Sequence, residues 1–148
     1  MTTLDDVVAL ARPEQFLMVV STLRADQTIQ ASLVNAGVLP HPVTGSDDVL
    51  AFVTYGAAKL RNLHGRRQVT VTVRSGWQWA TVEGTAELIG PDDPHPAVDA
   101  ERLRLLLREI FAAAGGTHDD WDAYDATMFA ERRAAVLVGP RRAYTNRR

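Results

Sequence analysis

The chain has 148 residues, 46% of them hydrophobic and 23% charged, and a formal net charge of −2. This length predicts a single globular domain over residues 1–148 that buries about 70% of the surface of the unfolded chain. The absence of cysteine excludes disulfides, thiolate nucleophiles and cysteine-ligated metals, and the weak negative charge argues against a nucleic-acid partner.

The N-terminal part predicts a helix and a β-hairpin. Residues 4–12 have amphipathic spacing, with Thr3 as a candidate N-cap and Pro13 ending the helix. Residues 16–23 form a continuous apolar run, which is typical of a strand buried on both faces, and residues 28–36 return as an alternating strand. Residues 37–47 contain prolines and glycine, and we expect a loop there.

The stretch 48–73 is the most informative part of the chain. Residues 49–54 predict a buried strand, 59–63 have the spacing of a short helix, and 68–73 alternate as a half-buried strand. Lys59 is the only lysine in the chain and follows the strand end, near the Thr54 hydroxyl and free backbone N–H groups. That arrangement suits a phosphate; the alternative is a solvated surface lysine.

Two tryptophans open the strand predicted over residues 77–89, which follows a turn at Ser75-Gly76. Val82, Ala86 and Leu88 alternate on the core side, so Trp77 and Trp79 point to the opposite face. Large aromatics on such a face are typical of an interface or a ligand wall. The alternative is that this end of the strand crosses over and both rings belong to the core.

The C-terminal part changes to a helical period. One apolar face predicts a helix, closed by two glycines, with the residues Leu103, Leu106, Leu107, Ile110 and Ala114. A second helix is predicted over 118–131, with Trp121, Tyr124, Ala126 and Met128 buried, then a buried strand over 134–138 and an arm from Pro140 to Tyr144. Six or seven short strands with hairpin connections predict a mainly β, antiparallel barrel or sandwich.

Motifs for other chemistries are missing. No apolar run approaches the roughly 20 residues of a membrane span, and no signal peptide is recognisable. We therefore expect a cytoplasmic protein without a membrane partner. The histidines have no metal-binding spacing and no serine sits in a hydrolase elbow, so we predict neither a metal site nor a hydrolase triad.

Several motifs resemble the flavin and deazaflavin oxidoreductases related to pyridoxine 5′-phosphate oxidase, and within them the actinobacterial branch that uses coenzyme F-420. The resemblance is carried in order by Ile29-Gln30-Ala31-Ser32, Lys59-Leu60-Arg61-Asn62-Leu63, Gly76-Trp77-Gln78-Trp79 with Val82-Glu83-Gly84, His118-Asp119-Asp120-Trp121-Asp122-Ala123-Tyr124 and Arg132-Arg133. It implies a split β-barrel of six or seven strands with flanking helices, forming a homodimer that holds the cofactor between its subunits.

The resemblance also implies a set of cofactor-binding residues. Thr54 and Lys59 would hold the phosphate, and Trp77 and Trp79 would cover the site from the partner subunit. The edge of the ring would lie along Gln30, Ser32, Leu33, Val34 and Asn35.

Arg61 and Asn62 belong to the lysine motif. Arg61, with Arg66 and Arg67, would either meet the oligoglutamate tail of F-420 or form an ordinary solvated turn. Relatives often carry arginine at the position of Ala57. We therefore expect either a lower phosphate affinity or a phosphate contact from Arg61, Arg66 or Arg67. The loop 38–46 could form one wall of the substrate pocket.

We therefore expect an F-420-dependent reductase that transfers hydride to a small organic acceptor, with the cofactor supplying the reactivity. No residue of the chain is identified as catalytic. One alternative is an FMN-dependent oxidoreductase or pyridoxine-phosphate-oxidase-like enzyme of the same fold. A second is a non-catalytic protein that binds the cofactor.

Overall fold

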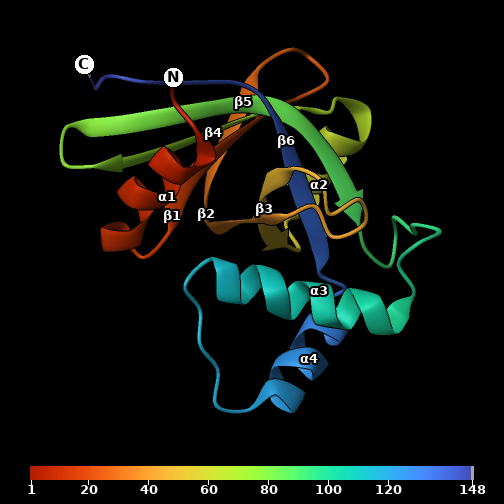
Figure 1. The fold of residues 1–148 in the computed structure, drawn as a ribbon. Helices are drawn as coiled ribbons and strands as arrows, with labels where there is room; N and C mark the ends of the chain where they lie inside the picture. The colour runs from red at the N-terminus through yellow and green to blue at the C-terminus, as the bar shows by residue number, and fades with distance from the viewer. Residues whose placement is uncertain (148) are drawn as a thin grey trace.

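Six antiparallel strands close into a barrel in the computed structural model, which describes residues 1–147 (Figure 1). Around the barrel they follow the order β1-β2-β3-β6-β5-β4. The bounds are β1 (Leu17–Leu23), β2 (Ile29–Pro40), β3 (Asp48–Thr54), β4 (Gln68–Ser75), β5 (Gln78–Ile89) and β6 (Ala134–Thr145). The predicted antiparallel barrel is confirmed, with six strands in the described part of the chain.

Helices flank the barrel. They are α1 (Leu4–Ala11), α2 (Ala57–Gly65), α3 (Ala100–Ala113) and α4 (Trp121–Ala130), and a 3-10 turn over Arg12–Glu14 follows α1. Thr3 caps α1 as predicted, in a reciprocal capping box with Asp6. Helix α2 connects β3 to β4, so it places its side chains at the end of the barrel where β3 finishes. No helix among residues 1–147 is long and apolar enough to cross a membrane.

The core has two parts because α3 packs on the outside of the barrel. Phe52, Met18 and Leu50 are fully buried in the interior. A second cluster joins α3 to the outer faces of β3 and β6, through residues such as Ala51, Leu106 and Leu137. β3 and residues 134–138 of β6 are therefore largely buried on both faces, as predicted, whereas the rest of β6 is half-buried or exposed.

The prediction that the strand over residues 16–23 is buried on both faces is wrong for the protomer. Its side chains alternate between buried and exposed, and Leu17 and Val19 are 37% and 42% exposed. The apolar outer face of β1 continues onto β2, where Leu33 pairs with Val19 and is 61% exposed. Helix α3 contacts β2 near Gly37, at the far end of that strand, and leaves the outer face of β1 and of residues 29–35 of β2 exposed.

The largest differences from the predicted element ends are in β2, β6 and α4. β2 runs on to Pro40, since residues 36–40 pair with 48–52, and the loop shrinks to 41–47. The proline lies at the end of the strand, where its missing N–H disturbs the ladder least. β6 is one continuous strand to Thr145, accommodated by an irregularity at Glu83/Gly84.

The third difference concerns α4, which begins at Trp121 rather than His118. Of its residues only Tyr124 is fully buried; Trp121 and Met128 are half-buried. The predicted burial of Ala126 is wrong: it is exposed, because α4 packs mainly against α3 and has no second layer behind it.

Candidate functional site

Lys59 is a buried cation in the first turns of α2. Its side chain is 8% exposed, and its Nζ lies 3.5 Å from Thr54 Oγ1 and 5.6 Å from the ring centre of Phe52. Among residues 1–147 no ion pair includes this ammonium. Desolvation therefore lowers the pKa of Lys59 below its ordinary value. The solvated surface lysine considered as an alternative is wrong.

The surroundings of the ammonium favour an anion. The N-cap of α2 is Gly56, which offers no side-chain cap, so the first N–H groups of the helix have no side-chain acceptor. The Gly56 N–H donates to Thr54 Oγ1 at 3.1 Å, which fixes the hydroxyl beside Lys59. A buried ammonium, a hydroxyl and a helix N-terminus are together the donor set that binds phosphate. These residues fit the phosphate of a cofactor.

Asn62 lies one turn further along α2 and is also buried, at 7% exposure. Its Nδ2 donates to Thr22 Oγ1 at 3.1 Å and to Gln30 Oε1 at 3.2 Å. The bond from Asn62 occupies the carbonyl oxygen of the Gln30 amide, so its NH₂ group remains available to donate to another partner. The predicted residues Gln30, Thr54, Lys59 and Asn62 are thus brought together by one helix, with β1, β2 and β3.

Thr22 is part of this site but was not predicted from the sequence. It sits inside an apolar strand, and a single buried threonine there carries no local signal. The pair formed by Tyr55 and Arg133 was missed in the same way: the Arg133 guanidinium carbon lies 3.9 Å from the centre of the Tyr55 ring, directly after Thr54. The pairing of Thr54 with Ala134 produces this contact, and sequence separation hides it.

The other predicted residues of β2 divide between two faces. Ser32 and Val34 are half-buried on the same side as Gln30, whereas Leu33 and Asn35 are exposed on the outer face. Asn35 Nδ2 donates to the Gln15 carbonyl at 2.8 Å. A single protomer therefore does not direct all five side chains toward Lys59.

The tryptophans point away from the core, as predicted. Trp77 lies in the turn before β5 and is 94% exposed, while Trp79 is half-buried and meets Tyr144 edge-on with ring centres 6.1 Å apart. Both lie at the hairpin end of β4, whereas α2 joins the opposite end of that strand. Within one protomer they are not neighbours of Lys59.

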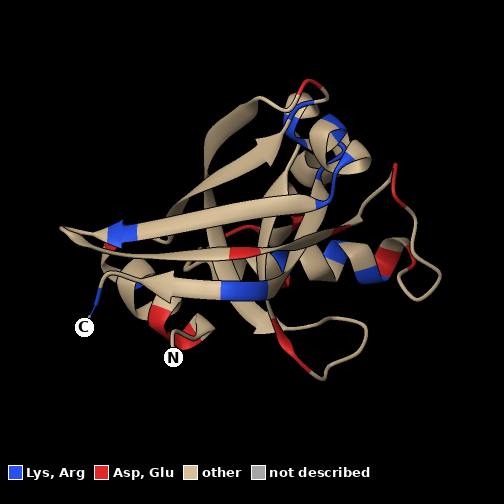
Figure 2. Ribbon diagram, turned by 90° about the horizontal axis from the view of Figure 1, so that it is seen from above, with Lys and Arg blue, Asp and Glu red and all other residues tan. Residues whose placement is uncertain are grey.

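Basic residues gather on α2 and the turn after it (Figure 2). Arg61 and Arg67 are exposed, as is Ala57 in the first turn. Arg66 instead donates from Nε to the Leu23 carbonyl at 2.9 Å, which ties the turn to β1. Arg61 and Arg67 thus remain the candidates for a cationic strip.

The loop over residues 41–47 lies beyond the Pro40–Asp48 pair, at the end of β3 opposite Thr54. His41 Nε2 holds it to Glu87 Oε1 at 2.8 Å. In the protomer this loop therefore does not border the Lys59 site.

Comparison with known proteins agrees with this architecture. Residues 4–137 match the family model described as pyridoxamine 5′-phosphate oxidase. Among solved structures, a conserved hypothetical protein from Mycobacterium tuberculosis superposes with a TM-score of 0.68 at 15% identity, over 98% of this chain and 84% of the other.

Two further structures carry functional descriptions. A pyridoxamine 5′-phosphate oxidase-related, FMN-binding protein from Nostoc punctiforme gives a TM-score of 0.65 at 13% identity, over 96% of this chain and 80% of its own. An F420 reductase gives 0.60 at 18% identity, over 88% and 90%. At these identities the structural likeness shows a shared fold.

Proposed function

Because the chain belongs to the pyridoxamine 5′-phosphate oxidase family, we propose that it is an oxidoreductase that binds a flavin-type cofactor, and specifically coenzyme F-420. The observation that carries the proposal is the buried ammonium of Lys59, which has no carboxylate partner among residues 1–147 and lies beside Thr54 at an uncapped helix N-terminus. A fold stabilises such a cation poorly unless an anion completes it.

The chain contributes binding and orientation. Lys59, the Thr54 hydroxyl and the first N–H groups of α2 would hold the cofactor phosphate, and the Asn62–Gln30 pair would present an amide donor to the ring. When bound, the cofactor supplies hydride chemistry toward a small organic acceptor. Ser32 and Val34 continue from Gln30 along the same side of β2 and would line the ring.

F-420 is preferred over FMN because of the basic residues on α2. Both cofactors carry a phosphate, so Lys59 does not distinguish them. The oligoglutamate tail of F-420 needs cations beyond the phosphate, and the exposed Arg61 and Arg67 would supply them. FMN would leave these arginines to solvent.

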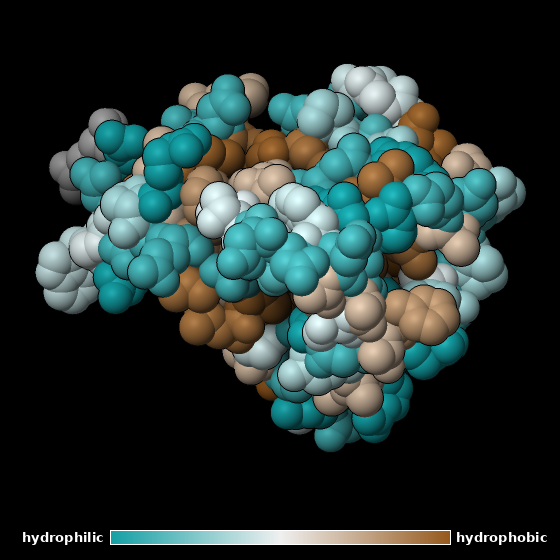
Figure 3. Space-filling view, turned by 90° about the horizontal axis from the view of Figure 1, so that it is seen from below, coloured by the Kyte–Doolittle hydropathy of each residue, from teal (hydrophilic) through white to brown (hydrophobic). Residues whose placement is uncertain are grey.

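We further propose a homodimer that completes the site. The outer face of β1 and β2 exposes Leu17, Val19, Ile29 and Leu33, an unusual set of side chains for a sheet face turned to water. Apolar residues also reach the surface in patches on the face seen from below (Figure 3). A second copy would cover the β1–β2 face and bring its own Trp77 and Trp79 over the cofactor.

Titration of the purified protein with F-420 and FMN tests the cofactor assignment. We expect F-420 to bind more tightly, by about tenfold, with an advantage that shrinks as salt screens the tail contacts. Equal affinities, or preference for FMN, would refute the choice of F-420. Reduced F-420 is then offered to a panel of electrophilic acceptors; binding without turnover would favour the non-catalytic alternative.

Trp77→Ala tests the dimer. Since the indole is 94% exposed in the protomer, its removal should weaken dimerisation or cofactor binding and leave the unfolding of the protomer nearly unchanged. Light scattering after size-exclusion chromatography and urea unfolding measure the two effects. A wild type that is monomeric at all concentrations would remove the partner subunit from the site.

A further inference from the structure

A cavity of about 630 Å³ lies between α3, α4 and the proline-rich segment 90–99. None of the residues that we expect to hold the cofactor lines it. Its volume falls within the range of about 300–1,000 Å³ that is common for small-molecule sites. It is therefore a separate candidate site.

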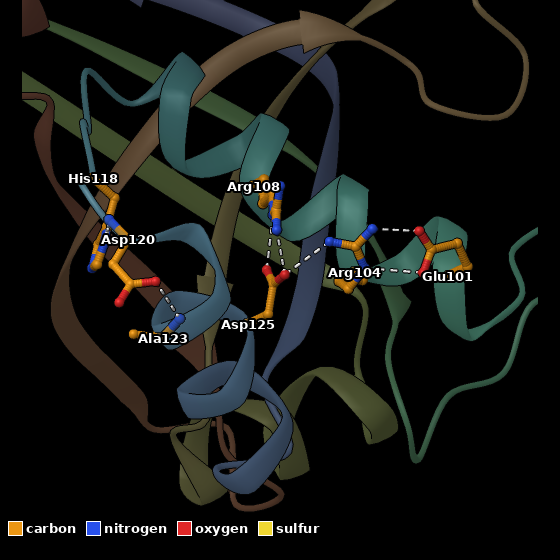
Figure 4. A network of polar contacts seen from close by, with 7 residues as sticks. All are labelled: Glu101, Arg104, Arg108, His118, Asp120, Ala123 and Asp125. Atoms are coloured by element: carbon orange, nitrogen blue, oxygen red, sulfur yellow. Dashed lines mark hydrogen bonds and ion pairs between the residues drawn. The ribbon is translucent and has the colours of Figure 1, made fainter.

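The walls of this cavity are held in place by contacts within the chain. Asp125 of α4 accepts from both Arg104 and Arg108 of α3 (Figure 4), and Tyr124 Oη donates to the Leu107 carbonyl at 2.9 Å. These contacts fix α3 and α4 against each other along one side of the cavity.

The segment 90–99 is anchored separately. His64 Nε2 of α2 lies 2.7 Å from Asp93 Oδ1, and Arg132 donates to Asp92 at 2.6 Å. Two isolated bridges, Gly90–Asp93 and His95–Val98, fold the segment on itself. A cavity with anchored walls needs little ordering when a ligand enters, which favours binding.

The lining selects against charged ligands. Most of its surface comes from apolar side chains such as Leu103, Met128 and Phe129. Each carboxylate and guanidinium in the lining already has a partner in the chain: Asp99 accepts from the Arg102 N–H, Glu101 and Asp125 pair with Arg104, and Arg133 pairs with Glu131. A ligand charge would have to break one of these pairs or stay unpaired in an apolar site.

The lining also favours an aromatic molecule over a protein segment. Phe129 is 85% exposed at the cavity and Met128 adds a polarizable thioether, and both interact well with aromatic rings. A peptide would bring backbone N–H and C=O groups that apolar walls leave unsatisfied, and the closed barrel offers no free strand edge to pair with them.

We propose that this cavity binds an uncharged, largely apolar aromatic small molecule. The site is distinct from the phosphate site. Its walls come from α3, α4 and the segment 90–99, with Ile89 and Arg133, whereas the phosphate site is built on α2 and the ends of β1, β2 and β3. Arg133 lies between the two, because it lines the cavity and also covers the Tyr55 ring.

A pair of matched fluorescent probes tests the proposal on the full chain. N-phenyl-1-naphthylamine is uncharged, and 8-anilino-1-naphthalenesulfonate has the same two ring systems with a sulfonate added. We expect saturable binding of the uncharged probe at one site per protomer, at least about tenfold tighter than the sulfonate. Absence of saturable binding, or equal affinities for the two probes, would overturn the proposal.

Variants on α4 locate the site. Ala126→Trp places a large ring in the lining at an exposed position, so it should fold normally and weaken the uncharged probe by about tenfold or more. Ala123→Trp puts the same ring on an exposed position outside the lining and should leave affinity unchanged. Equal effects of the two variants would overturn the assignment, as would loss of probe binding when the protein self-associates.

Lys59→Met separates this proposal from the proposed function. Because Lys59 does not line the cavity, this variant should keep the affinity for the uncharged probe even where it loses the cofactor. A parallel loss of both ligands would show one shared site and overturn the second one.

Discussion

Replacing Lys59 by methionine separates stability from binding at one position. The side chain is 8% exposed and its ammonium has no counter-ion among the described residues, so the ligand-free protein bears the cost of its desolvation. Methionine is one atom shorter than lysine and removes the charge. Thr54 Oγ1 retains the hydrogen bond from the Gly56 N–H, so no buried polar atom is orphaned. We expect the free energy of unfolding to stay equal or rise, by up to about 2 kcal/mol.

Cofactor binding should change in the opposite direction. The loss of one charge-assisted hydrogen bond, worth roughly 1.5–3 kcal/mol, corresponds to about 10- to 150-fold weaker binding of the cofactor phosphate. Calorimetric titration measures affinity, and urea unfolding without ligand measures stability.

Arg61→Met is the matched control for this variant. It removes a cation from the same helix at an exposed position, and we expect less than about a fivefold loss of affinity, the worth of an exposed ion pair. Unchanged cofactor affinity in Lys59→Met would remove Lys59 from the site. A large loss of stability would refute the view that its charge is a cost to the fold.

Three further predictions concern Lys59, Gly37 and Asp125. Burial lowers the pKa of Lys59 below 10.5, so cofactor affinity should fall as the pH rises through that lowered pKa. The free energy of unfolding of the ligand-free protein should rise over the same pH range, because the unfolded state there binds the proton that the folded state has lost. Titrations at several pH values should show both trends in the wild type and neither in Lys59→Met. In Gly37→Ala the new Cβ would lie 2.4 Å from the carbonyl carbon of Ala113, so α3 must shift and the free energy of unfolding should fall by about 2 kcal/mol or more. In the control Gly65→Ala the new Cβ meets no atom within 4 Å, and we expect no change in stability. Similar melting temperatures for the two variants would contradict this packing. Hydrogen bonds from Arg108 and Arg104 lower the pKa of Asp125 to about 2. Asp125→Asn should therefore lower the free energy of unfolding by about 1–2 kcal/mol at neutral pH, and this difference should disappear as the pH falls from 3.8 through about 2. Urea unfolding at several pH values measures it, and a difference that does not depend on pH would exclude the ion pairs as its source.

Local patterns were sufficient for most secondary structure. Alternation over residues 68–73 and the helical period from Leu103 to Ile110 identified strand and helix correctly, because each element buries one face. The orientation of the tryptophans also followed from alternation with Val82 and Leu88. Lys59 stood out because its residue type is unique in the chain and it follows a strand end.

Burial of whole faces depended on tertiary packing. The apolar runs over 16–23 and 134–138 look alike in sequence, yet the first is open on one side and the second is covered by α3. Hydrophobicity records that a side chain prefers contact, and it does not record which element or which copy of the chain supplies it.

The sequence by itself determined the strands, the helices and the residue most suited to hold an anion, because these depend on local periodicity and residue chemistry. Only the tertiary structure decided that Asn62 joins Thr22 to Gln30, that Arg133 covers Tyr55, and that α3 and α4 border a cavity. These contacts link residues that are far apart in the chain. Strand register and helix packing create them, and the pattern of neighbouring residues does not encode either.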